Sequence, residues 1–128
     1  MADTKEQFER VISQSRELFE KKLKDYGPSW RIMRPQSLTD QIFIKANRIR
    51  SLEIKGVSMV DEGIGPEFVA IVNYVVIGLI QLAKGFADTT DISNEEALAL
   101  YDKYITETKE LMYAKNHDYG EALSLIHI

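Results

Sequence analysis

The segment GPEFVAIVNYVVIGLIQLAKG, residues 65–85, contains the longest apolar stretch of the chain, Phe68 to Ala83, and points to an all-helical architecture. Pro66 falls in a first helical turn, where its missing N–H has no helical partner to lose, and Glu67 puts a carboxylate at the positive end of the helix dipole. Apolar residues cover nearly every face of this helix. We therefore expect it to lie in the middle of the domain. The stretch contains polar residues and is shorter than the roughly 20 residues of a membrane span, which favours a buried central helix.

Three further helices are predicted around this segment, at about residues 4–24, 37–56 and from 93 onward. Each begins at a Ser or Thr followed three residues later by Gln, Asp or Glu, which is the pattern of a capping box. Each also carries apolar residues at the spacing of three and four that marks one buried helical face. Four such helices with short connections predict an all-α, four-helix bundle-like fold.

Composition narrows the class of protein. With 128 residues, of which 45% are apolar, the chain has room for one domain with a core. It contains no cysteine, so neither a disulfide framework nor a thiolate metal site can form. The charged N-terminus MADTKEQFER lacks the apolar centre of a signal peptide, which predicts a cytoplasmic protein.

The charge distribution indicates an anion site. The net charge is only -4, but residues 31–50 carry five cations and a single acid, Asp40. One basic segment in an acidic chain favours local anion binding over a nucleic-acid surface.

A repeat is visible around the triplet Asp25-Tyr26-Gly27. The same triplet recurs at residues 118–120, and flanking residues match it at the same offset of 93 residues. Both triplets follow a long amphipathic stretch, which favours duplication over coincidence. We therefore predict a first complete helical repeat at 1–108, the start of a truncated second repeat at 109–122, and a non-native tail without a functional role at 123–128.

The chain has no cysteine nucleophile, GxSxG elbow, P-loop or metal-type histidine pair. The first candidate site residues are instead two cations, Lys45 and Arg48. Lys45 falls on the apolar face of its helix, with Arg48 at the edge of that face. A cation directed at the core needs a partner. Either Lys45 forms a structural ion pair or extends its head to solvent, or the two cations line an interhelical pocket and bind phosphate.

Two polar features leave similar alternatives. Asn73, in the middle of an apolar helix, must hydrogen-bond inside the protein, either to a neighbouring helix or to a bound base or sugar. The Asp25-Tyr26-Gly27 triplet and Trp30 form either a structural helix end or an aromatic face on which a base stacks.

Several carboxylates are candidates for holding Mg²⁺, which prefers oxygen ligands and keeps several waters. The candidates are Asp40, Glu62 and Glu67. Each also has a structural explanation: Asp40 and Glu67 suit helix N-termini, and Glu62 suits a polar loop.

Three sequence blocks together carry a family resemblance. KLKDYGPSW (22–30), SLTDQIFIKANRIRSLE (37–53) and DEGIGPEFVAIVNY (61–74) occur in order. Together they resemble the nucleotide modification associated domain 1 family. That family is similar to the all-α, MazG-like nucleoside-triphosphate pyrophosphohydrolases, which use magnesium and generally form dimers.

The resemblance implies a site and two possible functions. It places Asp25, Tyr26 and Gly27 in the first block, Lys45 and Arg48 in the basic helix, and Glu62, Asn73 and Tyr74 in the third block. Ala70 stands where the family pattern has aspartate, so this copy lacks one expected ligand. The resemblance therefore implies a magnesium-dependent nucleoside-triphosphate pyrophosphohydrolase or a degenerate nucleotide-binding or dimerisation module. Either would pair with a second copy, in tandem or as a homodimer.

Overall fold

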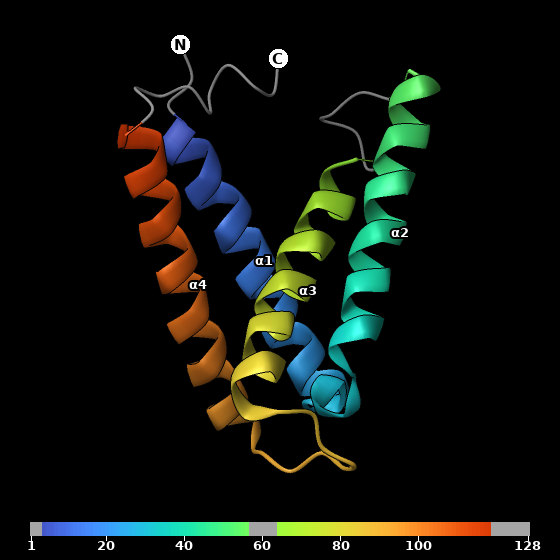
Figure 1. The fold of residues 1–128 in the computed structure, drawn as a ribbon, viewed down its shortest axis with the longest axis vertical. Helices are drawn as coiled ribbons and strands as arrows, with labels where there is room; N and C mark the ends of the chain where they lie inside the picture. The colour runs from blue at the N-terminus through green and yellow to red at the C-terminus, as the bar shows by residue number, and fades with distance from the viewer. Residues whose placement is uncertain (1–3, 57–63, 119–128) are drawn as a thin grey trace.

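The computed structural model describes residues 4–56 and 64–118, and this part of the chain is helical without strands (Figure 1). The predicted all-α, four-helix fold is thereby confirmed. The elements are α1 (Thr4–Tyr26), a short 3₁₀ helix η1 (Ser29–Ile32), α2 (Pro35–Ile54), α3 (Gly65–Lys84) and α4 (Asn94–Asp118).

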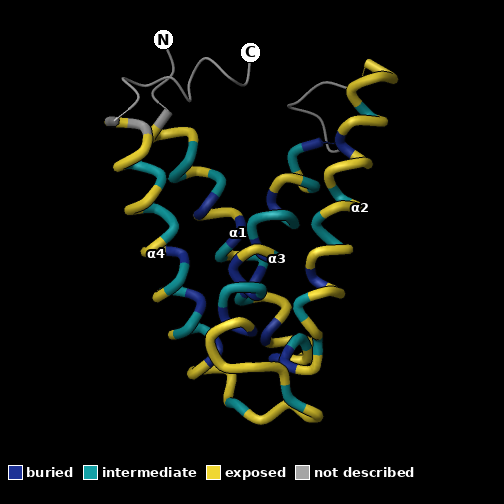
Figure 2. The backbone as a smooth tube through the Cα atoms, viewed as in Figure 1, coloured by how far each residue is buried: buried dark blue, intermediate teal, exposed yellow. Residues whose placement is uncertain are grey.

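Helix α3 is the centre of the arrangement, as its apolar surface predicts. It packs against α1, α2 and α4, while α1 and α4 also pack on each other. Figure 2 shows buried positions concentrated where α1, α3 and α4 converge, whereas α2 is largely exposed. The core includes Phe19 and Leu23 of α1, Ile80 of α3 and Tyr101 of α4. By length and composition alone α3 is also long and apolar enough to cross a membrane, a test that the core helix of a bundle also passes.

The helix ends follow local chemistry. Gly27 has φ of 63° and donates its N–H to the Leu23 carbonyl at 2.8 Å, so it ends α1 in the left-handed conformation that glycine allows. Helix α1 therefore reaches Tyr26, two residues beyond the predicted end. At α4 the predicted cap is confirmed, because Ser93 Oγ accepts the Glu96 N–H at 3.0 Å.

The predicted start of α2 at Ser37 is wrong. The helix begins at Pro35, with Arg34 as its N-cap and no side-chain capping bond. Proline is preset for the first helical position, so the helix starts two residues earlier and Ser37 lies inside its first turn. The capping box with Asp40 is consequently not formed.

Charged pairs join α1 to α4 along their outer edge. Arg16 donates to both carboxylate oxygens of Asp102, at 2.7 and 3.0 Å, and Lys109 Nζ lies 3.0 Å from Glu9.

Helix α4 runs without interruption across the predicted repeat boundary at residue 108. Buried Ile12 and Ile105 stand at the same offset of 93 residues as the two triplets. The two-copy interpretation stays a prediction, because residues 119–128 lie outside the described part.

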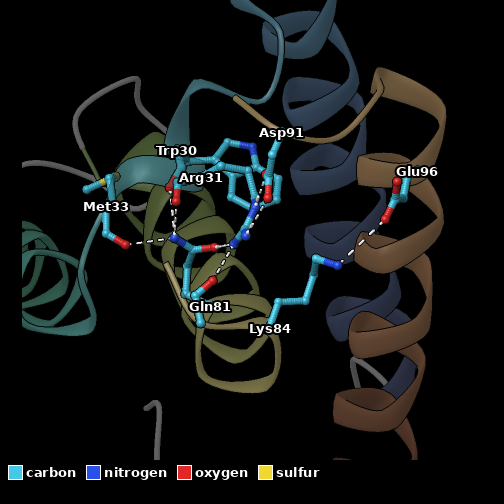
Figure 3. A network of polar contacts seen from close by, with 8 residues as sticks. Trp30, Arg31, Met33, Gln81, Lys84, Asp91 and Glu96 are labelled. Atoms are coloured by element: carbon cyan, nitrogen blue, oxygen red, sulfur yellow. Dashed lines mark hydrogen bonds and ion pairs between the residues drawn. The ribbon is translucent and has the colours of Figure 1, made fainter. Parts of the chain in front are cut away.

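A buried polar network ties η1 to the end of α3 (Figure 3). Gln81 Nε2 lies 2.8 Å from the Arg31 carbonyl and 2.7 Å from the Met33 carbonyl, and Gln81 Oε1 accepts a hydrogen bond from Arg31 Nη1. The Arg31 guanidinium also donates to the Gly85 carbonyl at 2.7 Å and to Asp91 at 2.8 and 3.2 Å. Arg31 is 2% exposed and Gln81 1%, so the network holds η1 from inside the protein.

Stability in acid should depend on Asp91. The hydrogen bond from Arg31 holds the pKa of Asp91 below its ordinary value. A carboxylate whose folded-state pKa is lowered stabilises the fold above its unfolded-state pKa of about 3.9, and this stabilisation is lost as the pH falls through the lower folded-state value. We expect Asp91→Asn to be less stable than the wild type at neutral pH and to lose less stability in acid. Urea unfolding at several pH values checks this, and two parallel curves would contradict it.

Candidate functional site

A cavity of about 430 Å³ lies between the C-terminal half of α1, η1, the middle of α2 and the middle of α3. Its size is in the range of small-molecule sites. The wall is mainly apolar and aromatic, with a few polar groups. The lining residues from α1 are Leu18, Phe19, Lys22, Leu23 and Tyr26; Gly27, Ser29, Trp30, Ile32 and Met33 follow in and around η1; α2 adds Lys45 and α3 adds Ala70, Asn73, Tyr74 and Ile77.

The charged groups of the wall are both cations. Lys22 and Lys45 reach the cavity from α1 and α2, and within the described residues its lining contains no carboxylate. Lys22 is exposed, with Nζ 6.0 Å from the centre of the Tyr26 ring. A small apolar cavity edged by two ammonium groups suits a ligand with an apolar or aromatic body and a negative end.

Glu67 partners Lys45 from the first turn of α3. Its Oε2 lies 3.4 Å from Lys45 Nζ, and its Oε1 lies 2.8 Å from Arg48 Nε. The Glu67 side chain is 13% exposed, and its Oε2 has no hydrogen-bond partner among the described residues. The contact between Lys45 and Glu67 is therefore an ion pair without good hydrogen-bond geometry, and the contact from Arg48 to Glu67 is the better-directed one. The structural ion-pair interpretation of Lys45 is thus correct, and the same ammonium still edges the cavity.

The Asn73 side chain is held by a hydrogen bond from α4. Its Oδ1 accepts a hydrogen bond from the Tyr101 hydroxyl at 2.9 Å, and Tyr101 is fully buried. Burial raises the pKa of Tyr101, so the hydroxyl keeps its proton and acts as a donor. The predicted need of Asn73 for an internal partner is confirmed.

An aromatic series extends from the cavity into the core. Trp30 lies with its ring centre 6.0 Å from that of Phe19, and Phe19 stacks on Tyr101 at 4.3 Å. Because Trp30 belongs to η1, the network around Gln81 indirectly sets where its ring stands. The indole is half-buried at the wall of the cavity.

The structure brings together most of the predicted substrate-binding residues. Tyr26, Trp30, Lys45, Asn73 and Tyr74 all line the one cavity, although they come from four different elements. Two others do not reach it. Asp25 is exposed at the end of α1, and Arg48, 62% exposed, lies outside the lining and contacts Glu67.

The predicted magnesium ligands are not brought together in the described residues. Asp40 is exposed on α2, Glu67 is bound by two cations, and Glu62 lies outside the described part. Within residues 4–56 and 64–118 no group of three acidic or histidine side chains is placed to hold a metal. The carboxylates described do not fit Mg²⁺ at this cavity, and with Glu62 undescribed the metal stays a prediction.

Two residues at the site were not predicted. Lys22 stands one helical turn before Tyr26, and this spacing, which puts both on one face of α1, was the available signal. Tyr101 lies on the apolar stripe of α4, where nothing local distinguishes a tyrosine that orients Asn73 from one that only fills the core.

Comparison with known proteins supports the family resemblance over slightly less than half of the chain. Residues 22–82 match the family described as Nucleotide modification associated domain 1. The matched range contains every residue of the cavity wall except Leu18 and Phe19. Neither the comparison with curated proteins nor that with solved structures returned a match.

Proposed function

We propose that the cavity binds a nucleotide. In this arrangement Lys22 and Lys45 contact the phosphate, and the base lies against Trp30 and the neighbouring aromatic rings. Ammonium groups form charge-assisted hydrogen bonds with phosphate oxygens, and bases stack on indole and phenol rings. Both chemistries are available in one space of suitable size.

The observation that carries the proposal is the convergence of five predicted substrate-binding residues on one cavity. They are separated by up to 48 positions in the sequence, from Tyr26 to Tyr74, and come from elements that need not have met. The description of the matched family, which refers to nucleotide modification, also supports the proposal.

Binding is the favoured function, and hydrolysis is the alternative. A MazG-like, magnesium-dependent pyrophosphohydrolase needs a group of carboxylates to hold the metal. Glu67, the carboxylate that contacts the lining residue Lys45, is already engaged by Lys45 and Arg48. Ala70, at the position of a family aspartate, contributes only a methyl group to the wall. This copy therefore suits a nucleotide-binding module, which would support a second copy.

Thermal unfolding with a panel of deoxynucleoside mono- and triphosphates tests the proposal. A ligand present at about 100 times its Kd stabilises by about 2.7 kcal/mol, so the Tm should rise by about 5–10 °C. The rise should not require Mg²⁺ for monophosphates, because the cations of the wall belong to the protein. No rise with any nucleotide would contradict both binding and hydrolysis.

Pyrophosphate release, measured in the same samples, separates the two functions. Stabilisation without release supports a binding module, and magnesium-dependent release supports the hydrolase. Ala70→Asp is the informative variant, because release gained only by this variant would show that the wild-type site is one carboxylate short.

A further inference from the structure

The Asn73 amide has a fixed orientation. The bond to Asn73 Oδ1 is the one hydrogen bond that the Tyr101 hydroxyl makes among the described residues. If the amide were reversed, the hydroxyl would accept from Asn73 Nδ2, and its own buried proton would be left without an acceptor, which is costly. The hydroxyl must therefore donate to Oδ1, which turns the Nδ2 group away from Tyr101 and leaves it as the free end of the side chain.

This free end belongs to the deep part of the cavity. Asn73 is 9% exposed and is bonded to a residue of the core, whereas Tyr26, which also lines the cavity, is 70% exposed. The two lysines lie toward solvent, since Lys22 is exposed and 29% of the Lys45 side chain is accessible. A nucleotide would therefore enter with its base inward and its phosphate at the lysines.

We infer that the cavity selects nucleotides whose base carries a carbonyl, rather than an amino group, at the edge facing Asn73, and that Tyr101 is the positioning residue for this choice. The inference rests on the proposed nucleotide binding. In the described residues, Asn73 Nδ2 has no hydrogen-bond partner and is not among the buried unpaired atoms, so it is a donor open to the cavity that a base displacing water must satisfy with an acceptor. A carbonyl supplies one, while an amino group at the same position would set two donors against each other.

Calorimetric titration of the full chain with two matched pairs of nucleotides tests the inference. The pairs are dUMP with dCMP and dIMP with dAMP, which differ mainly in a carbonyl or an amino group on the base and share the same phosphate. We expect the carbonyl member of each pair to bind about 10-fold more tightly, the difference that one satisfied rather than opposed hydrogen bond produces.

Three variants identify the cause of the preference. Tyr101→Phe keeps the stacked ring and frees the amide to rotate, so the ratio within each pair should fall to about 2-fold or less. Asn73→Asp replaces the inward donor with an acceptor, so the preference should reverse toward the amino member. Tyr104→Phe is the matched control: it removes a hydroxyl from the same helix at a residue outside the lining, and should keep the wild-type ratio.

The outcomes separate failure of the inference from failure of the proposed function. Equal binding within the pairs, or tighter binding of the amino members, overturns the inference and leaves nucleotide binding standing. A wild-type preference that survives Tyr101→Phe and Asn73→Asp also overturns it. Absence of binding for all four nucleotides overturns both. Circular dichroism of each variant confirms that it is folded, and the reversal by Asn73→Asp gives a result even if Tyr101→Phe fails to fold.

Discussion

Replacing Gln81 with leucine is expected to lower the free energy of unfolding by about 3–5 kcal/mol. Leucine has a suitable size and suits the apolar surroundings of α3, so loss of packing is a minor part of the effect. The larger part is polar. The Arg31 guanidinium loses an acceptor in a buried position, and the Arg31 and Met33 carbonyls lose the amide that now bonds both. Each buried group left without a partner costs about 1–3 kcal/mol.

Urea unfolding followed by circular dichroism measures this loss. Gln14→Leu is the matched control, because Gln14 is an exposed glutamine on α1 and its replacement should change stability by less than about 0.5 kcal/mol. A loss below about 1 kcal/mol for Gln81→Leu would mean that the network in Figure 3 does not stabilise the fold. It would also mean that Gln81 of α3 does not hold η1, and with it Trp30, in place.

Replacing Lys45 with glutamine should weaken nucleotide binding by about 10–100-fold, the value of one or two charge-assisted hydrogen bonds to phosphate. The variant removes one of the two cations of the cavity wall and keeps most of the side-chain length. Its effect on stability should be smaller, about 1 kcal/mol or less, because the pair with Glu67 is partly exposed and Glu67 keeps Arg48. A large loss of affinity with a small loss of stability is therefore the expected combination.

Arg50→Gln provides the control for Lys45→Gln. Arg50 is an exposed cation on the same helix, outside the cavity lining, and its removal changes the net charge equally. If both variants weaken binding to the same small extent, the effect is general attraction of a negative ligand and Lys45 has no specific role. If Lys45→Gln unfolds the protein or leaves affinity unchanged, the ion pair with Glu67 is its whole function.

The architecture could be predicted from local patterns because each helix carries its own signal. Pro66 and Gly85 bracket α3, and the contact from Ser93 to Glu96 forms as expected. The start of α2 was misjudged because two local signals compete there, and the proline outweighs the serine. Helix η1 was not predicted, since four residues are too few to show a periodic pattern.

Most of the residues that line the site could be predicted from the sequence, but their hydrogen-bond and ion-pair partners could not. Asn73 and Lys45 stood out because a polar group on an apolar helical face needs a partner. The partners could not be identified, because Tyr101 lies 28 positions from Asn73 and Glu67 lies 22 from Lys45. Arg31 illustrates the same limit: among five cations of one segment, nothing local indicates that this one is buried against Gln81 and Asp91.

Trp30 is the single tryptophan of the chain, and its position makes it an internal optical reporter. The indole is part of the cavity wall, and its ring lies beside that of Phe19. Its emission therefore reads the polarity of this one space without interference from any other indole. Displacement of water by a stacked base should quench or shift that emission, so the unmodified protein can signal its own occupancy without a dye or an enzymatic assay.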